Sequence, residues 1–191
     1  MSTGKHGYPR NLILKDGSEV VLRPLDPLRD ETGLQEFFAR VPEEERWYLV
    51  DDVADPRVIS SWARTVDPKR VLPIVALCED GSIAAIATLH RYSHGARGHI
   101  GRIRLVVDAA QRNQRLGTYL LLDLIQLAVD VGLDLLVLEF IKGVEDKAIR
   151  AARRLDFFEQ AVLPDYARDQ RGNRYDLVFM VKRIHRGYDD F

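Results

Sequence analysis

The chain has 191 residues, enough for one domain that buries about 70% of the surface its unfolded form exposes. Hydrophobic residues make up 46% and charged residues 30%, which is ordinary globular usage and argues against a disordered chain. The net charge is −1, with both signs mixed along the sequence. This balance argues against nucleic acid or an anionic membrane as the main partner, because both favour an excess of Lys and Arg.

Cysteine usage and the N-terminus indicate the compartment. Cys78 is the single cysteine, so no intramolecular disulfide is possible, and its apolar surroundings favour a buried thiol. Residues 1–10 are polar and lack the apolar core of a signal peptide. No apolar stretch approaches the roughly 20 residues that span a bilayer. We therefore expect a cytoplasmic protein without a membrane partner.

The first part of the sequence predicts a hairpin and two helices. Apolar runs at residues 11–14 and 20–25 flank an Asp-Gly pair, which is a strong hairpin signal. Asp-Pro pairs at residues 26–27 and 55–56 indicate helix starts, because Asp caps a helix and Pro fits its first turn. Apolar residues at helical spacing follow each pair: Leu34, Phe37, Phe38 and Val41, then Val58, Ile59, Trp62 and Val66.

The middle of the sequence predicts three strands and a long helix. Runs at residues 71–77 and 83–90 flank Glu-Asp-Gly and favour a second hairpin, and residues 99–107 favour a third strand. Residues 116–131 form the clearest helix. Apolar side chains cover a wide part of its circumference, which predicts that the helix is well buried. Gly132 is a plausible stop for that helix.

The last part predicts a strand at 135–141, a helix at 147–155, and strands at 160–163 and 175–184. The order β-β-α-α-β-β-β-α-β-α-β-β is accommodated best by an α+β sandwich, in which helices cover a mixed sheet. We expect a single domain over residues 1–191. Its core should span about residues 12–184, and its termini at 1–9 and 185–191 should be flexible.

The segment between the strand that ends at Val107 and the helix near Gly117 is the main candidate binding site. A strand that turns into a helix N-terminus points several unpaired N–H groups at one spot, and the helix dipole adds about half a positive charge. Gly117 permits close approach to the backbone, and Thr118 adds a hydroxyl. This combination suits a phosphate or pyrophosphate, although most such turns bind nothing.

Residues 112–117, Arg-Asn-Gln-Arg-Leu-Gly, resemble the signature Arg/Gln-x-x-Gly-x-Gly/Ala of GNAT acyltransferases. Residues 14–24, 152–155 and 173–177 further resemble the GNAT domains of Pat-type protein lysine acetyltransferases. The likeness covers about residues 12–184. It implies a GNAT-like acyl-CoA N-acyltransferase fold and an enzyme that moves an acetyl group from acetyl-CoA to a primary amine. The acceptor would be a protein lysine or a small molecule, and no metal would be needed.

The resemblance also implies which residues hold the cofactor. A backbone N–H of the central strand would stabilise the developing oxyanion, whatever the side chains there. Pantetheine would pair with Leu105, Val106 and Val107, and pyrophosphate would meet the backbone of Arg112, Asn113, Gln114, Arg115, Leu116, Gly117 and Thr118.

Several residues depart from the family pattern. Arg115 stands at the first glycine of the signature, where its guanidinium could meet a phosphate or could fill the space that CoA needs. Asp156 stands where glycine is usual, and Glu145 where asparagine is usual. Arg102 replaces a glutamate that Pat-type domains share. Ala152 replaces the tyrosine that many GNAT enzymes use as general acid, an absence that Pat-type domains share.

Two residues are candidates for catalysis. An amine with a pKa near 10.4 must lose a proton before it attacks, so a base is needed. Glu139 is the best candidate, as an isolated carboxylate in an apolar strand. The alternative is that it faces solvent or pairs with Arg102 or Arg104. Tyr166 lies where relatives line the acceptor cleft, and packing is an equal explanation.

A competing hypothesis is a GNAT-like domain that has lost transfer activity and serves as an acyl-CoA sensor or a regulatory or interaction module. Arg102 and Arg115 are the residues that favour it. His90, His94 and His99 do not form a metal-ligand pattern. The resemblance leaves a homodimer open, since relatives commonly form one, and we expect no nucleic-acid partner.

Overall fold

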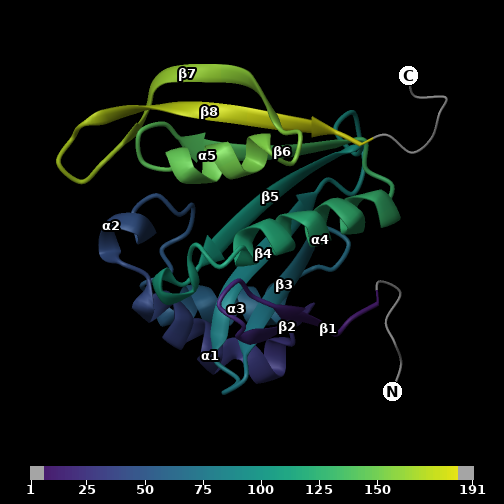
Figure 1. Cartoon of the computed structure of the whole chain (residues 1–191). Helices are drawn as coiled ribbons and strands as arrows, with labels where there is room; N and C mark the ends of the chain where they lie inside the picture. Colours follow the sequence, from purple (N-terminus) through teal and green to yellow (C-terminus); the bar gives the residue numbers. More distant parts are fainter. Residues whose placement is uncertain (1–6, 185–191) are drawn as a thin grey trace. The chain divides into compact units, whose positions relative to one another are not determined.

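The computed structural model describes residues 7 to 184 (Figure 1). The chain divides into two compact units, which are described in turn. Unit 1 comprises Met1–Thr88 and Leu105–Leu120, and unit 2 comprises Leu89–Arg104 and Leu121–Phe191. Of the termini expected to be flexible, residues 1–6 and 185–191 lie outside the described part of the chain.

Unit 1 contains the N-terminal hairpin, the early helices and the strand that follows them. Its elements are β1 (Arg10–Ile13), β2 (Glu19–Pro24), α1 (Pro27–Arg40), α2 (Glu43–Arg46), α3 (Pro56–Thr65) and β3 (Val71–Cys78). β2 pairs antiparallel with both β1 and β3. The expected hairpin is therefore confirmed.

Both Asp-Pro pairs begin a helix, as predicted. The side chain of Asp26 accepts a hydrogen bond from the N–H of Leu28 at 3.1 Å, and Asp55 accepts one from the N–H of Arg57 at 2.9 Å. Each cap satisfies a donor that a helix start leaves unpaired. α2 was not predicted, because it is one turn long, has no buried residue and therefore shows no apolar face.

The core of unit 1 lies between α1, α3 and the sheet. Its members are buried apolar residues from the helices, the loop after α2 and the strands: Leu34, Phe37, Phe38, Val41, Val53, Ile59, Val75, Ile83 and Ile86. Trp62 contacts this cluster and meets the ring of Phe38 edge-to-face, with 5.8 Å between ring centroids. The apolar spacing read from the sequence therefore marks the buried faces of both helices.

Three elements run through both units, and four more follow them in unit 2. The shared elements are β4 (Ile83–Arg91), β5 (Ile100–Val107) and α4 (Leu116–Asp130), and the later ones are β6 (Leu135–Ile141), α5 (Asp146–Arg153), β7 (Phe158–Arg168) and β8 (Arg174–Arg183). β5 and β6 pair in parallel, whereas β8 pairs antiparallel with both β6 and β7.

α4 ends where the sequence predicts. Gly132 has a φ of 80°, a left-handed conformation that glycine adopts readily. The N–H of Leu133 then donates to the carbonyl of Ala128 at 2.9 Å, which satisfies one of the last carbonyls of the helix. This closing bond turns the chain from α4 toward β6.

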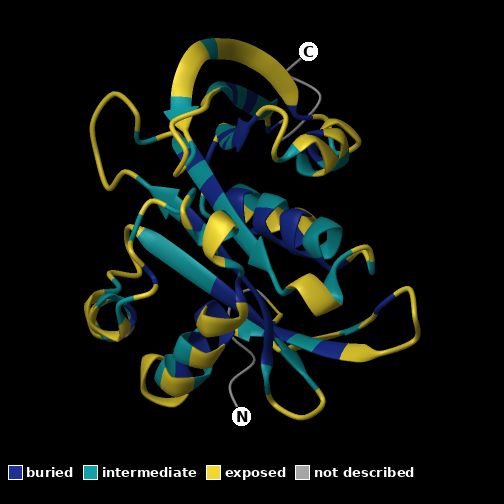
Figure 2. Ribbon diagram, turned by 90° about the vertical axis from the view of Figure 1, so that its left-hand side faces the viewer, coloured by how far each residue is buried: buried dark blue, intermediate teal, exposed yellow. Residues whose placement is uncertain are grey.

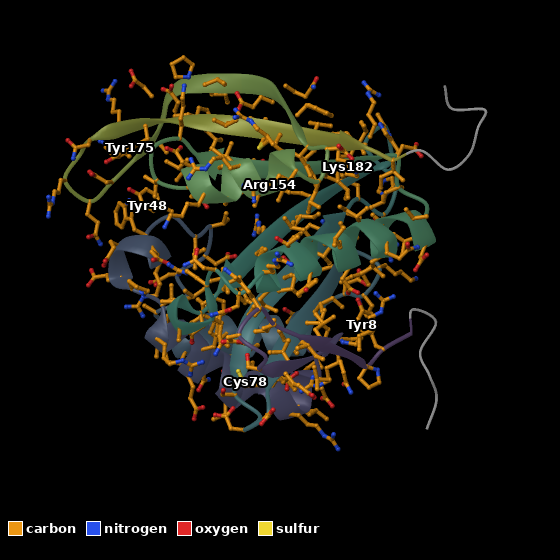
Figure 3. All side chains as sticks on the ribbon, viewed as in Figure 1. Tyr8, Tyr48, Cys78, Arg154, Tyr175 and Lys182 are labelled. Carbon is orange, nitrogen blue, oxygen red and sulfur yellow. The ribbon has the colours of Figure 1, made fainter. Side chains whose placement is uncertain are left out.

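The sheet of unit 2 has one buried face. Along β6, Leu136, Leu138 and Phe140 are buried, whereas the alternate residues Leu135 and Val137 are only partly buried. On β8, Lys182 donates through Nζ to the carbonyl of Leu155, just after α5, at 2.9 Å (Figure 3). β7, at the end of the sheet, is exposed along most of its length (Figure 2).

The hydrogen-bonded order of the strands is β1-β2-β3-β4-β5-β6-β8-β7. Because β5–β6 is parallel and the outer pairs are antiparallel, the sheet is mixed, and the expected α+β class is confirmed. The main difference is β7, which extends well beyond the expected 160–163. Irregular pairing after Glu159 and after Leu163 lets the strand continue past Pro164. No helix within residues 7–184 is long and apolar enough to cross a membrane.

Candidate functional site

The predicted cofactor turn lies in unit 1, between the end of β5 and the start of α4. We call residues 112–118 the cofactor turn. A short 3-10 helix, Ala109–Gln111, precedes it. Asn113 and Arg115 have positive φ values of 63° and 68°. The first bond into α4 runs from the N–H of Tyr119 to the carbonyl of Arg115 at 3.0 Å.

The N–H groups of residues 115 to 118, in the second half of the cofactor turn, are available to a ligand. Helix geometry leaves the first N–H groups of α4 without an intrahelical acceptor. Among the described residues, none accepts a hydrogen bond from the N–H groups of residues 115 to 118. These donors, together with the helix dipole, suit an anionic group such as a diphosphate.

Arg115 takes the backbone conformation that the glycine of the signature would supply. Its φ of 68° is left-handed, a conformation that costs a non-glycine residue about 1–2 kcal/mol and that glycine adopts readily. The side chain is exposed and forms no ion pair with the described residues. Asp156 repeats the pattern: it replaces a usual glycine, and its φ is 61°. Both residues that depart from a usual glycine therefore adopt a backbone conformation that glycine favours.

Gly117 brings the start of α4 against the end of β5. A Cβ atom on Gly117 would lie 3.6 Å from Cδ2 of Leu105 and 3.7 Å from Cγ2 of Val107, which is ordinary contact. Alanine therefore fits at this position, whereas a longer side chain must displace its neighbours. The side chain of Val106 packs instead against the core of unit 1. The cofactor turn is thus held against the end of β5, and β5 is held by the core of unit 1.

Asp108 anchors the chain as it leaves β5. Its carboxylate caps the 3-10 helix through the N–H of Ala110 at 3.0 Å and accepts from Nε of Arg40 at 2.8 Å. Arg40 also donates to the carbonyl of Ile83. Burial raises the pKa of Asp108, but the bonds from Arg40 and Ala110 lower it further, so its pKa lies below the ordinary value. The carboxylate is therefore ionised at neutral pH.

Arg112, the first residue of the signature, holds α2 with its side chain. Nη1 and Nη2 donate to the two carboxylate oxygens of Glu45 at 2.8 and 2.5 Å, and Nε and Nη2 each lie 3.2 Å from the carbonyl of Val107. The hydrogen bond with Glu45 raises the pKa of Arg112. The guanidinium is thus committed to protein partners, and the N–H of Arg112 donates to the carbonyl of Ala109 at 3.4 Å, so neither group is available to a ligand.

Two further contacts were not predicted from sequence. The carbonyl of Gln114 accepts from the N–H of Lys15 at 3.3 Å, which ties the turn to the first hairpin. Glu145, in place of the usual asparagine, accepts from the N–H of Ile141 at 2.7 Å and so orders the start of α5. Glu45 also lacked a usable signal, because a run of three glutamates is typical of a solvated surface.

In unit 2, Glu139 is not isolated. Nη2 of Arg102 lies 3.0 Å from its Oε1, and the side chains of Arg102 and Glu139 are 43% and 28% exposed. Of the interpretations drawn from sequence, the ion pair with Arg102 is the one that the structure shows. The guanidinium is not aligned for a hydrogen bond, so buried Oε1 accepts none from the described residues. A buried acceptor without a donor is uncommon in folded proteins.

Tyr166 lies on β7 and is 67% exposed. Packing in a core is therefore excluded for this residue, and contact with a ligand or solvent remains. The neighbouring Asp165 has a positive φ of 55° at the strand irregularity. Within residues 7–184, no group of three or more His, Cys, Asp or Glu side chains could hold a metal ion.

Comparisons with known proteins identify the family. The chain is 27% identical over 111 residues to YwnH of Bacillus subtilis (strain 168), whose name assigns it as a phosphinothricin acetyltransferase; the match covers 58% of this chain and 67% of that protein. The structure of yncA, named as an acetyltransferase of Salmonella typhimurium and solved with its cofactor acetyl-CoA, matches with a TM-score of 0.73. It is 19% identical, over 88% of this chain and 96% of its own.

The GNAT domain of S. lividans PAT matches with a TM-score of 0.75 at 15% identity, over 92% of this chain and 97% of its own. At such identities these two structural matches establish the fold alone. The sequence model of the Acetyltransferase (GNAT) family matches residues 33–157, well over half of the chain. Together with the mixed sheet and the signature turn between β5 and α4, this match shows that the chain belongs to the GNAT family of acetyltransferases.

Proposed function

We propose that this GNAT acetyltransferase transfers the acetyl group of acetyl-CoA to a primary amine, on a protein lysine or a small molecule. Acetyl-CoA is the acetyl donor of the family and supplies the group as a thioester. The resemblance to Pat-type domains favours a lysine acceptor, and the name of the relative YwnH favours a small amine. Both acceptors present the same chemistry, an amine that must be deprotonated before it reacts.

The observation that carries the proposal is the cofactor turn. Its N–H groups at residues 115 to 118 have no acceptor within residues 7–184, and Arg115 has a left-handed backbone conformation of the kind that glycine favours. The pyrophosphate of acetyl-CoA would meet the cofactor turn through these donors. The backbone of residues 105–107 would pair with pantetheine, and one of its N–H groups would stabilise negative charge on the acetyl oxygen.

We assign the proton-accepting role to Glu139. Its Oε1 is buried and receives no hydrogen bond from the described residues, so it retains the capacity to accept a proton. Arg102, 3.0 Å away, would hold the carboxylate in position. Tyr166, which is exposed, would contact the acceptor.

The first test of this function is calorimetric titration of the purified chain with acetyl-CoA and, in parallel, with free CoA. We expect micromolar binding, followed by turnover with at least one member of an amine panel. The panel should contain lysine peptides and phosphinothricin, so that it separates the two acceptor classes. Binding without turnover on any amine would instead support an acyl-CoA sensor. Absence of both heat and thermal stabilisation would contradict the proposed site.

Gly117 gives a sharper test of the same site. Gly117→Ala should retain acetyl-CoA binding, because a Cβ atom there meets Leu105 and Val107 at ordinary contact distance. Gly117→Leu should abolish binding, because the longer side chain must displace these residues or enter the ligand space. Circular dichroism of both variants checks the fold. Equal acetyl-CoA affinity in a folded Gly117→Leu variant would count heavily against the site.

We also propose that two copies of this chain associate as a homodimer. β6, β8 and β7 present a half-exposed apolar face, opposite the buried one, that includes Leu135, Val137, Phe158, Leu177, Phe179 and Val181. A solvent-facing sheet surface is usually polar, so an apolar one suggests an interface. In a two-fold dimer the same face of both copies would form the interface. Glu139, which pairs in register with Phe179, projects from the same face beside Arg102, so the partner copy must leave Glu139 open to the amine if that carboxylate is to accept a proton.

Light scattering coupled to size exclusion tests the dimer, which should show twice the chain mass of 21.8 kDa. Phe158→Asp should shift the protein to monomer, because Phe158 is 61% exposed and its replacement does not disturb the core. A monomeric wild type at concentrations of tens of micromolar would contradict the interface.

A further inference from the structure

The contact between Glu45 and Arg112 joins segments that are far apart in the sequence. Glu45 belongs to α2, a single turn without a side-chain cap or a buried residue. Arg112 is the residue immediately before the left-handed Asn113 in the cofactor turn. A helix this short is not stable alone, because each end leaves backbone groups unpaired. The contact with Arg112 therefore helps to form α2 and does not simply add to a helix that is already stable.

The guanidinium of Arg112 binds two acceptors at once. Two nitrogens form a bidentate pair with the carboxylate of Glu45, and Nε and Nη2 donate to the carbonyl of Val107, the last residue of β5. Planar bidentate pairs of this kind fix orientation as well as supplying energy. Arg112 is therefore held between the end of β5 on one side and α2 on the other.

The backbone directly after Arg112 needs such support. Asn113 and Arg115 both adopt left-handed conformations, which non-glycine residues retain only when their surroundings enforce them. The carbonyl of Gln114 is tied to the N–H of Lys15, so the turn is already anchored on its far side. The pair between Glu45 and Arg112 anchors its near side. Free N–H donors are useful for binding only if this backbone is held in place.

We propose that Glu45 is a positioning residue for the acetyl-CoA site, acting through Arg112 to hold the N–H donors of the cofactor turn in their binding conformation. The inference rests on the proposed function, because it presumes that this turn receives the pyrophosphate. Glu45 itself would touch no part of the cofactor. The two side chains are each 38% exposed but form a bidentate pair, so any contribution to global stability must be measured separately from the positioning role.

The test compares Glu45→Gln with a matched control, Glu44→Gln, which removes a neighbouring charge that forms no hydrogen bond with the described residues of the cofactor turn. We expect Glu45→Gln to raise the Kd for acetyl-CoA about tenfold, which is the loss typical when a residue that orients a ligand-binding group is removed. Its KM for acetyl-CoA should rise in parallel, with kcat at saturation unchanged. Glu44→Gln should match wild type in both constants.

A second measurement separates positioning from general destabilisation. Hydrogen exchange of the cofactor turn amides, measured without ligand, should accelerate in Glu45→Gln while exchange in the core of α1 stays at the wild-type rate. In an Arg112→Lys background, which lacks the bidentate pair, Glu45→Gln should change the Kd much less. That loss of effect would show that Glu45 acts through Arg112.

The outcomes for this inference and for the proposed function are distinguishable. If wild type binds acetyl-CoA and Glu45→Gln binds as tightly as Glu44→Gln, the positioning role is overturned and the proposed function stands. If Glu45→Gln weakens binding equally in the wild-type and Arg112→Lys backgrounds, action through Arg112 is overturned. If wild type itself binds no acetyl-CoA, both proposals fail together.

Discussion

Arg115 places a large charged side chain on backbone that favours glycine. Its φ of 68° is costly for any residue with a Cβ atom and most costly for a β-branched one. We therefore expect Arg115→Gly to be as stable as wild type, since the relief of strain offsets the added freedom of the unfolded chain. Arg115→Val should lose about 1–2 kcal/mol. Thermal unfolding of the two variants side by side measures the difference.

The same pair of variants tests which part of Arg115 matters for the ligand. If the backbone supplies the donor, Arg115→Gly should retain acetyl-CoA binding within a few-fold. A large loss in Arg115→Gly, with the fold intact, would show that the guanidinium contacts the cofactor directly. Arg115→Val more stable than Arg115→Gly would contradict the left-handed conformation itself.

The buried pair between Asp30 and Arg23 predicts how stability depends on pH. Asp30 is 5% exposed and accepts from both terminal nitrogens of Arg23, at 2.6 and 2.7 Å, and from the N–H of Asp26. Burial raises the pKa of Asp30, but these bonds lower it further, so its folded pKa lies below the ordinary 3.8. The carboxylate therefore stabilises the fold above about pH 4 and loses this contribution as pH falls through its folded pKa.

Asp30→Asn should remove that contribution. At pH 7 the variant should lose about 2–4 kcal/mol of unfolding free energy, because the guanidinium of Arg23 loses its charged partner. As pH falls below about 4 the difference from wild type should shrink, because the unfolded wild-type chain then binds a proton that the folded state does not. Urea unfolding of both proteins at pH 7, 5 and 3 measures this. A difference that stays constant with pH would show that Asp30 is not ionised in the folded state.

At the scale of the element, Gly101 lets β5 lie close to its neighbours in unit 2. A Cβ atom there would stand 2.7 Å from Leu133, 2.8 Å from Leu89 and 3.0 Å from Leu136, all of them buried. Gly101→Ala should therefore cost about 1–3 kcal/mol, the range for an overfilled core. Chemical denaturation gives the value. Little or no loss would mean that the three leucines can move aside.

Gly33→Ala is a matched control for this change. Gly33 lies within α1, and a Cβ atom there would be 3.4 Å from the side chain of Ile83, close to ordinary contact. Alanine in a helix interior is favoured over glycine by up to about 1 kcal/mol. The same substitution should thus stabilise the protein at one position and destabilise it at the other.

The elements that were predictable from sequence are those whose signals are local. The caps at Asp26 and Asp55, the stop at Gly132 and the apolar strand β6 each depend on a few adjacent residues, and each is found where expected. The length of β7 was not predictable, because its continuation past Pro164 depends on pairing with β8. α2 was not predictable for the same reason, because it depends on contacts with residues that are distant in the sequence.

In the candidate site too, local features were predictable from sequence and contacts between distant residues were not. The position of the cofactor turn follows from a local motif, so its residues could be named from sequence alone. The partners of Arg112 and Glu139 could not be derived from spacing, because Glu45 and Arg102 are distant in the chain and become neighbours only in the folded structure. The pairing of Glu139 with Arg102 was one of several alternatives that sequence left open.

At the scale of the whole molecule, we propose that the two units form one cooperative domain. β4, β5 and α4 each begin in one unit and end in the other, so neither unit can lose these elements without affecting the other. Thermal or urea unfolding should therefore show a single transition. Acetyl-CoA should raise its midpoint, and the rise should continue with the logarithm of ligand concentration above the Kd, since only the folded state offers the site.

The two tryptophans make this test specific. Trp47 and Trp62 are the only tryptophans in the sequence, and both belong to unit 1, so fluorescence reports on that unit. Circular dichroism reports on the helices of both. If the chain is one cooperative domain, the two probes should give the same midpoint and the same slope. A Phe179→Trp variant adds a reporter on β8 in unit 2, and a separate transition for that reporter would show that the units unfold independently.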